Sequence, residues 1–106
     1  MIVVTSETIA NKKIVRTLGL VRGNTVRARH IGKDIMAGLR NIVGGEVHEY
    51  AKLIAESREQ TLDRMTAEAR SLGANAIIAT RFTTSVMAAG AAELLAVGTA
   101  VVVEDE

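Results

Sequence analysis

A long amphipathic helix is the feature that most constrains the fold of this chain. Between residues 46 and 72, apolar side chains recur every three or four positions and so share one helical face: Val47, Tyr50, Ala51, Ile54, Leu62, Met65, Ala69 and Leu72. The opposite face is polar and suits water: Glu49, Lys52, Glu56, Glu59, Asp63 and Arg70. Gly44-Gly45 precedes the helix, and Gly73 supplies the left-handed residue that ends many helices. Such a helix is roughly 40 Å long, so the remaining segments must be short elements packed against it.

Extended segments flank the helix on both sides. The sequence predicts a short edge strand at Ile2-Val3-Val4, a longer strand over 14–21 that resumes over 26–29, and a turn or bulge at Gly23-Asn24. Alternation in the second strand sets Ile14, Arg16, Leu18, Leu20 and Arg22 on one face and Val15, Thr17, Gly19 and Val21 on the other. After Gly73 we expect strands over 74–84 and 94–103, joined by a turn over 85–90, with Gly98 as a bulge or a close-contact point.

A second, shorter helix is predicted before the long one. Ile31, Ile35, Leu39 and Ile42 recur at helical spacing between residues 31 and 43. The predicted fold is therefore a single α+β domain over residues 1–106, with two layers: a small antiparallel β-sheet with one long and one short helix. A sheet of three or four strands leaves edges and one face poorly covered, and oligomerisation is the usual remedy.

Composition excludes several classes of protein. The chain has no cysteine, which rules out disulfides, iron–sulfur clusters and thiolate zinc sites. Tyr50 and Phe82 are the only aromatic residues, so the core must be aliphatic. The apolar run at the N-terminus is too short for a signal peptide, and no run approaches the length of a membrane span. We expect a cytoplasmic protein with no membrane partner.

Charge is unevenly distributed along the chain. Residues 1–45 carry eight Lys or Arg and two acidic residues, whereas residues 46–106 carry five Lys or Arg and ten acidic residues. The basic half could serve an anionic ligand. Alternatively, and in our interpretation more readily, the two halves could complement each other within one subunit or between subunits.

One run carries a family resemblance. The segment from Arg29 to Glu46, which contains Ala-Gly-Leu-Arg-Asn-Ile-Val-Gly-Gly, strongly resembles the YbjQ-like family, together with Leu72-Gly73-Ala74-Asn75-Ala76 and Gly98-Thr99-Ala100-Val101. Arg81-Phe82-Thr83-Thr84-Ser85 resembles a motif of one branch of that family. The resemblance implies a dodecin-like subunit fold and a ring-shaped homopentamer. It also implies heavy-metal binding, by the family's label alone and with no established activity.

The candidate site residues cluster in the basic half of the chain. A basic set could bind phosphate or carboxylate: Arg22, Arg27, Arg29 and Lys33. The polar face of the short helix adds three more candidates: Asp34, Arg40 and Asn41. His30 is the candidate metal ligand, although its cationic neighbours disfavour a metal ion, and His48 does not chelate together with the adjacent Glu49. The alternative for Asp34 is a structural ion pair across subunits, and for the histidines a solvent-facing or capping role. Without interleaved aromatic residues the basic set lacks the stacking platform of single-strand nucleic-acid binders, so we expect no specific nucleic acid as a partner.

The sequence thus favours a non-enzymatic, homo-oligomeric binding or scaffold protein. No cofactor is predicted, and a metal ion rests on the family resemblance. The alternative is a binder of a small anionic metabolite or cofactor at subunit interfaces. An enzyme with an inter-subunit site is the third hypothesis; Thr83, Thr84 and Ser85 lack the His-and-acid set that would make one of them a nucleophile.

Overall fold

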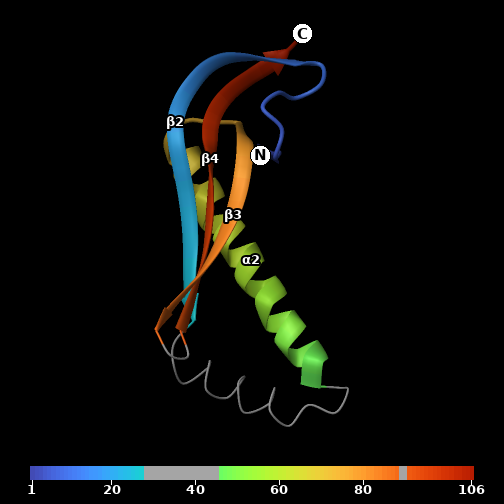
Figure 1. Cartoon of the computed structure of the whole chain (residues 1–106). Helices are drawn as coiled ribbons and strands as arrows, with labels where there is room; N and C mark the ends of the chain where they lie inside the picture. The colour runs from blue at the N-terminus through green and yellow to red at the C-terminus, as the bar shows by residue number, and fades with distance from the viewer. Residues whose placement is uncertain (28–45, 89–90) are drawn as a thin grey trace.

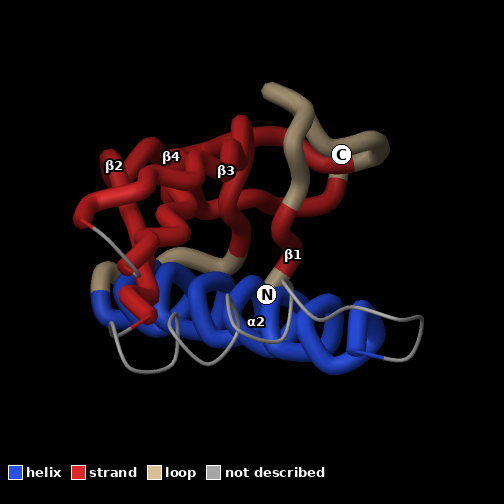
Figure 2. The backbone as a smooth tube through the Cα atoms, turned by 60° about the horizontal axis from the view of Figure 1, so that its bottom comes forward, coloured by secondary structure: helices blue, strands red, loops and turns tan. Residues whose placement is uncertain are grey.

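The computed structural model describes residues 1–27, 46–88 and 91–106 (Figure 1). The elements follow one another as β1 (Ile2–Val3), β2 (Lys12–Arg27), α2 (Glu46–Ser71), β3 (Ala76–Ala88) and β4 (Ala91–Asp105). The strands form one sheet in the order β1-β3-β4-β2, and α2 lies across one face of it (Figure 2). The two-layer α+β prediction is confirmed for these residues. The predicted short helix over 31–43 lies outside them.

The sheet is mixed, where the sequence predicted an antiparallel one. Strands β2, β4 and β3 pair antiparallel, but β1 pairs parallel with β3, with Ile2 opposite Ala76 and Val3 opposite Ile77. This pairing is parallel because β1 enters the sheet beside β3, far along the chain, and not through a hairpin. The predicted strand at the N-terminus is therefore correct, and it lies at an edge.

The strands are longer than predicted. Residues 85–88 continue β3 and pair with residues 91–93 of β4, so the predicted turn over 85–90 was wrong for Ser85 to Ala88. Val86 and Met87 are more apolar than turn residues usually are, and they belong to a strand.

Strand β2 is continuous through Gly23-Asn24, so the predicted turn or bulge there was also wrong. The register shifts instead between Ile14 and Arg16 and between Thr17 and Gly19, where Gly19 has φ +123°. The irregularity at Gly19 breaks the expected alternation, and as a result Leu18 and Val21 both pack against the same core cluster.

The helix ends as predicted. Gly73 has φ +88°, the N–H of Gly73 donates to the carbonyl of Arg70 at 3.0 Å, and the N–H of Ala74 donates to that of Ala69 at 3.1 Å. These two bonds form a Schellman motif, which satisfies carbonyls at the end of the helix.

The main core lies between α2 and the sheet. Its buried residues are mostly small or aliphatic: Val21, Met65, Ala69, Ile77, Ala96 and Ala100. A second, smaller cluster lies on the other face of the sheet near its upper end in Figure 1, where Ile9 of the loop before β2 packs against Ala76, Val101 and Val103. No helix in the described part of the chain is long and apolar enough to cross a membrane.

Candidate functional site

The predicted binding residues fall mostly outside the described part of the chain. Six of them lie outside it: Arg29, His30, Lys33, Asp34, Arg40 and Asn41. Of Arg27 only the backbone is described, at the end of β2 opposite Ala92. The anion site and the His30 site therefore stay predictions.

The described residues do not supply a metal site. Over residues 1–27, 46–88 and 91–106, no three His, Cys, Asp or Glu side chains lie close enough together to hold an ion. Because the chain has no cysteine, soft thiolate ligands are excluded throughout the sequence. We derive no chemistry through a metal.

The stripe of α2 that faces the sheet contains hydroxyls that the sequence pattern assigned to neither face. Ser57, Thr61, Met65 and Ala69 are buried at a spacing of four residues. The Thr61 hydroxyl donates to the Ser57 carbonyl at 2.8 Å and lies 3.0 Å from the Thr25 hydroxyl of β2. These bonds satisfy the buried hydroxyls of Thr25 and Thr61, so the cluster positions α2 on β2. The i, i+4 spacing with Met65 and Ala69 is the sequence signal that could have found it.

The same stripe continues beyond the sheet. Ile54 lies three residues before Ser57, on the same helical face, yet it is 37% exposed. In Figure 1 the N-terminal half of α2 diverges from the three long strands. The helix packs mainly against β2, less against β4 and least against β3. An apolar helix face and much of β3 are therefore left without cover from the described residues.

Strand β3 is exposed on both faces over five consecutive residues: Arg81, Phe82, Thr83, Thr84 and Ser85. Phe82 shares the helix side of the sheet with Ala96, its cross-strand neighbour, but is 43% exposed. On the opposite face, Leu20 and Val26 of β2 are 66% and 49% exposed. Val26 and Phe82 pair with Glu93 and Ala96 near one end of the sheet, whereas Leu20 pairs with Thr99 near its middle.

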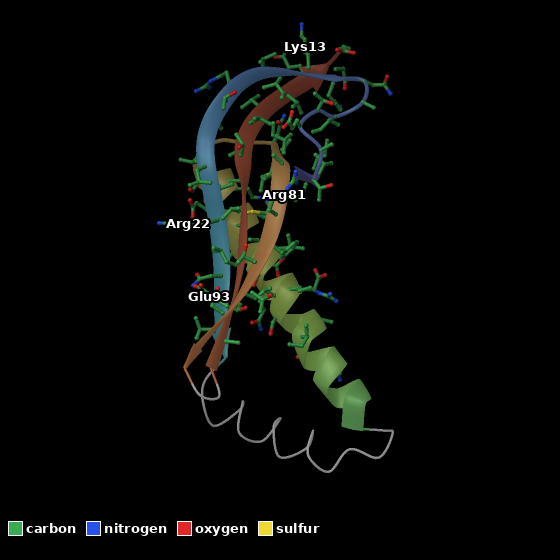
Figure 3. The ribbon with its side chains drawn as sticks, in the orientation of Figure 1. Lys13, Arg22, Arg81 and Glu93 are labelled. Carbon is green, nitrogen blue, oxygen red and sulfur yellow. The ribbon has the colours of Figure 1, made fainter. Side chains whose placement is uncertain are left out.

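The described charges of β2 are all positive, and they differ in what they contact. Lys12 forms an ion pair with Asp105, and this hydrogen bond and charge lower the pKa of the Asp105 carboxyl. Lys13, Arg16 and Arg22 are exposed, and Arg22 projects from the outer side of β2 (Figure 3). Part of the charge asymmetry in the sequence is thus balanced within one subunit, where the acidic C-terminal end pairs with the start of β2.

The other described arginine of the sheet has a structural role. Arg81 turns toward the N-terminal segment (Figure 3), and its Nη1 donates to the carbonyls of Thr5 at 2.7 Å and Thr80 at 2.8 Å. Arg22 and Arg81 flank Val97 across the sheet, but Arg81 is held by these carbonyls and the two guanidinium groups point apart. The two guanidinium groups therefore do not bind one anion between them.

The fold defines a class of protein: a small two-layer α+β domain in which the described residues leave one end of the sheet exposed. Comparison with known proteins gives the family. A family model described as "Putative heavy-metal-binding" matches residues 1–104, and the chain belongs to this YbjQ family. Curated relatives are UPF0145 proteins. One from Methanosarcina acetivorans is 54% identical over 95% of both chains, and one from Dehalococcoides mccartyi is 56% identical over 98% of this chain and all of its own.

A solved structure supports the fold alone. It is a protein of unknown function of the DUF74 family from Pediococcus pentosaceus, with a TM-score of 0.65 over 98% of both chains at 14% sequence identity. The family model and the curated relatives confirm the family resemblance found in the sequence.

Proposed function

We propose that this chain is the subunit of a non-enzymatic homopentamer that acts as a binding or scaffold protein in the cytoplasm. The observation that carries the proposal is the exposure of large apolar side chains on the sheet: Val26 and Phe82 near its uncovered end and Leu20 near the middle of β2. Burying these side chains against another copy would contribute about 25 cal/mol per Å² of apolar surface, before the entropic cost of association. The number five comes from the family resemblance.

The mass of the particle tests this proposal. Size-exclusion chromatography with light scattering, at micromolar chain concentration, should give a mass near five chains of 11.3 kDa. A monomer under these conditions would overturn the proposal. A stable assembly with another number of chains would support an oligomer and overturn the pentamer.

A second candidate is the binding of a small anionic metabolite at the subunit interfaces. It is favoured by the exposed cations of β2, among which Lys13, Arg16 and Arg22 face solvent. The predicted ligand residues are those of the basic half: Arg27, Arg29, Lys33, Asp34, Arg40 and Asn41. Arginine binds carboxylate and phosphate in bidentate geometry, which gives such a site its chemistry.

Native mass spectrometry of protein purified from its host separates the candidates. A co-purifying anion that is lost in Arg27→Ala and Arg29→Ala would support the second, with Arg58→Ala on the exposed face of α2 as the control. A stoichiometric metal lost in His30→Ala would instead support the family's description. An assembly with neither species would support a scaffold.

A further inference from the structure

Among the described residues, no strand lies beside the outer edges of β3 and β2 at the same end of the sheet. We propose that the outer edge of β3 pairs with the outer edge of β2 in a second copy of this chain, so that subunits join head to tail through one continuous sheet. This inference rests on the proposed assembly and names the contact that forms it.

The first open edge belongs to β3. The N-terminal segment covers only its first part: Ile2 and Val3 pair with Ala76 and Ile77, and the amides of Ala79 and Thr80 donate to Ser6 at 2.8 Å and Val4 at 3.1 Å. Beyond Thr80, no described strand borders β3 on this side. The open part coincides with residues 81–85, which are exposed on both faces.

Alternate residues of this segment direct their backbone N–H and C=O groups to the outer edge. The Thr80 amide points to the outer edge, because it donates to Val4. The register with β4 is regular from Arg81 onward, and bonding groups of successive strand residues alternate in direction. Phe82 and Thr84 therefore present their N–H and C=O groups to the outer edge, whereas Thr83 presents its groups to β4.

The second open edge is β2, the last strand of the sheet on the other side. Following the alternation through β4, Val21, Gly23 and Thr25 bond to β4, while Arg22 and Asn24 face outward. The carbonyl of Asn24 accepts a bond from Arg64 of α2 at 2.5 Å, which agrees with this direction and occupies one of the two lone pairs of that carbonyl. Two register shifts interrupt the first half of β2, and none interrupts residues 20–27. Such an unbulged edge without proline is a template for another strand.

The two edges match in level and in side-chain direction. Both open segments run beside residues 92–97 of β4, so they lie at opposite sides of the same part of the sheet. Strands β2 and β3 both pair antiparallel with β4, so they run in the same direction and would pair in parallel between copies. In a parallel pair, a residue that bonds across the edge lies opposite one that bonds the other way. This pairing keeps the helix-side residues of neighbouring copies on the same face. Phe82, for example, would lie beside a helix-side residue such as Thr25 of the partner strand.

Symmetry and charge narrow the arrangement further. Head-to-tail pairing uses both edges of every subunit and can close into a ring, whereas a two-fold β3–β3 contact would leave the whole edge of β2 open. Arg22 and Arg81 lie on the same face at the same level, so a register offset by two residues avoids like charges side by side. An offset of two residues in one direction places Thr83 beside Arg22 of the partner subunit, and an offset of two in the other direction places it beside Val26 of the partner subunit.

Proline at an outward amide tests the edge directly. Thr84→Pro and Arg22→Pro each remove an outward N–H, a change that edge strands tolerate when no strand is paired there. We expect each variant to lose assembly with an unchanged far-ultraviolet circular dichroism spectrum. Thr84→Val and Arg22→Thr keep the N–H and should assemble like the parent.

Mixing the two proline variants tests the head-to-tail direction. A Thr84→Pro copy keeps its β2 edge, and an Arg22→Pro copy keeps its β3 edge, so the mixture should form pairs with a mass of two chains. If β3 paired with β3 instead, Arg22→Pro alone would remain a dimer, and the proposal would be wrong.

A covalent test covers the case in which proline unfolds the subunit. Thr83→Cys is combined with Arg22→Cys or with Val26→Cys in this cysteine-free chain. Strand β4 separates positions 22 and 26 from position 83 within one subunit, so a disulfide must join two copies. We expect one of the two double variants to give a ladder of covalent multimers on a non-reducing gel.

The outcomes separate this inference from the proposed function. A monomeric parent would overturn both. An assembled parent whose proline variants keep its mass, or whose cysteine pairs give no multimers, would overturn the edge contact and leave the assembly standing.

Discussion

A Cβ atom at Gly23 of β2 would lie 2.3 Å from the carbonyl oxygen of Thr61 and 2.5 Å from the amide nitrogen of Met65. Helix and strand are therefore in backbone contact at this point, and the absence of a side chain sets the distance between the two layers. Gly98 of β4 is also crowded, but by the side chain of Ile77 at 2.6 Å.

We predict that Gly23→Ala lowers the free energy of unfolding by about 1–3 kcal/mol or more, because neither backbone atom can yield without moving α2. Gly98→Ala should cost less, since the closest atom is a side-chain methyl. Urea denaturation measures both, with Asn24→Ala as the control at an exposed neighbour. Equal losses for Gly23→Ala and Asn24→Ala would contradict the backbone contact.

The buried hydroxyl pair gives a second prediction. Thr61→Val alone leaves the buried Thr25 hydroxyl without its partner and should cost about 1–3 kcal/mol. The double variant Thr25→Val with Thr61→Val should recover part of this loss, because an apolar pair of the same shape carries no unpaired group. A double-mutant cycle by chemical denaturation measures the coupling, and strictly additive losses would show that the two hydroxyls act independently.

The helix end gives a third prediction. Gly73 has φ +88°, where a Cβ costs roughly 1 kcal/mol or more. Gly73→Val should therefore destabilise the protein clearly more than Gly73→Asn, because asparagine tolerates left-handed backbone better than a β-branched residue does. Thermal and urea unfolding compare the two variants. The prediction fails if both lose the same stability.

The pKa of Asp105 gives a fourth prediction. The hydrogen bond and charge of Lys12 hold this pKa below its ordinary value of 3.8, so the pair contributes stability above that pH and loses it as pH falls through the lowered folded-state pKa. In Lys12→Met, an NMR titration should find the Asp105 pKa raised toward its ordinary value. Lys13→Met is the matched control. An unchanged Asp105 pKa in Lys12→Met would contradict the pairing.

The last prediction concerns metal. The aliphatic core between α2 and the sheet should suffice for folding, since a structural zinc needs about four ligands and this chain has no cysteine and two histidines. Exhaustive chelation should leave the thermal midpoint and the particle mass unchanged. His30→Ala and His48→Ala should match the parent in metal content. A midpoint lowered by several degrees would instead support a structural ion.

The sequence by itself determined the long helix, its end at Gly73 and the two-layer class, because these follow from local periodicity and local backbone preference. It also predicted the N-terminal strand and the close contact at Gly98. The parallel pairing of β1 with β3 was decided only in the tertiary structure, because it joins residues more than seventy positions apart.

Tertiary structure also decided which polar residues are buried. Ser57 and Thr61 look solvent-compatible in sequence, but the backbone contact at Gly23 brings the helix close enough to bury both side chains and to let the Thr61 hydroxyl bond to Thr25. Conversely, Ile54 and Phe82 look like core residues, yet α2 diverges from the sheet and leaves both partly exposed. The local sequence pattern indicates which side chains can be buried, whereas the angle between the helix and the sheet decides which of them are buried.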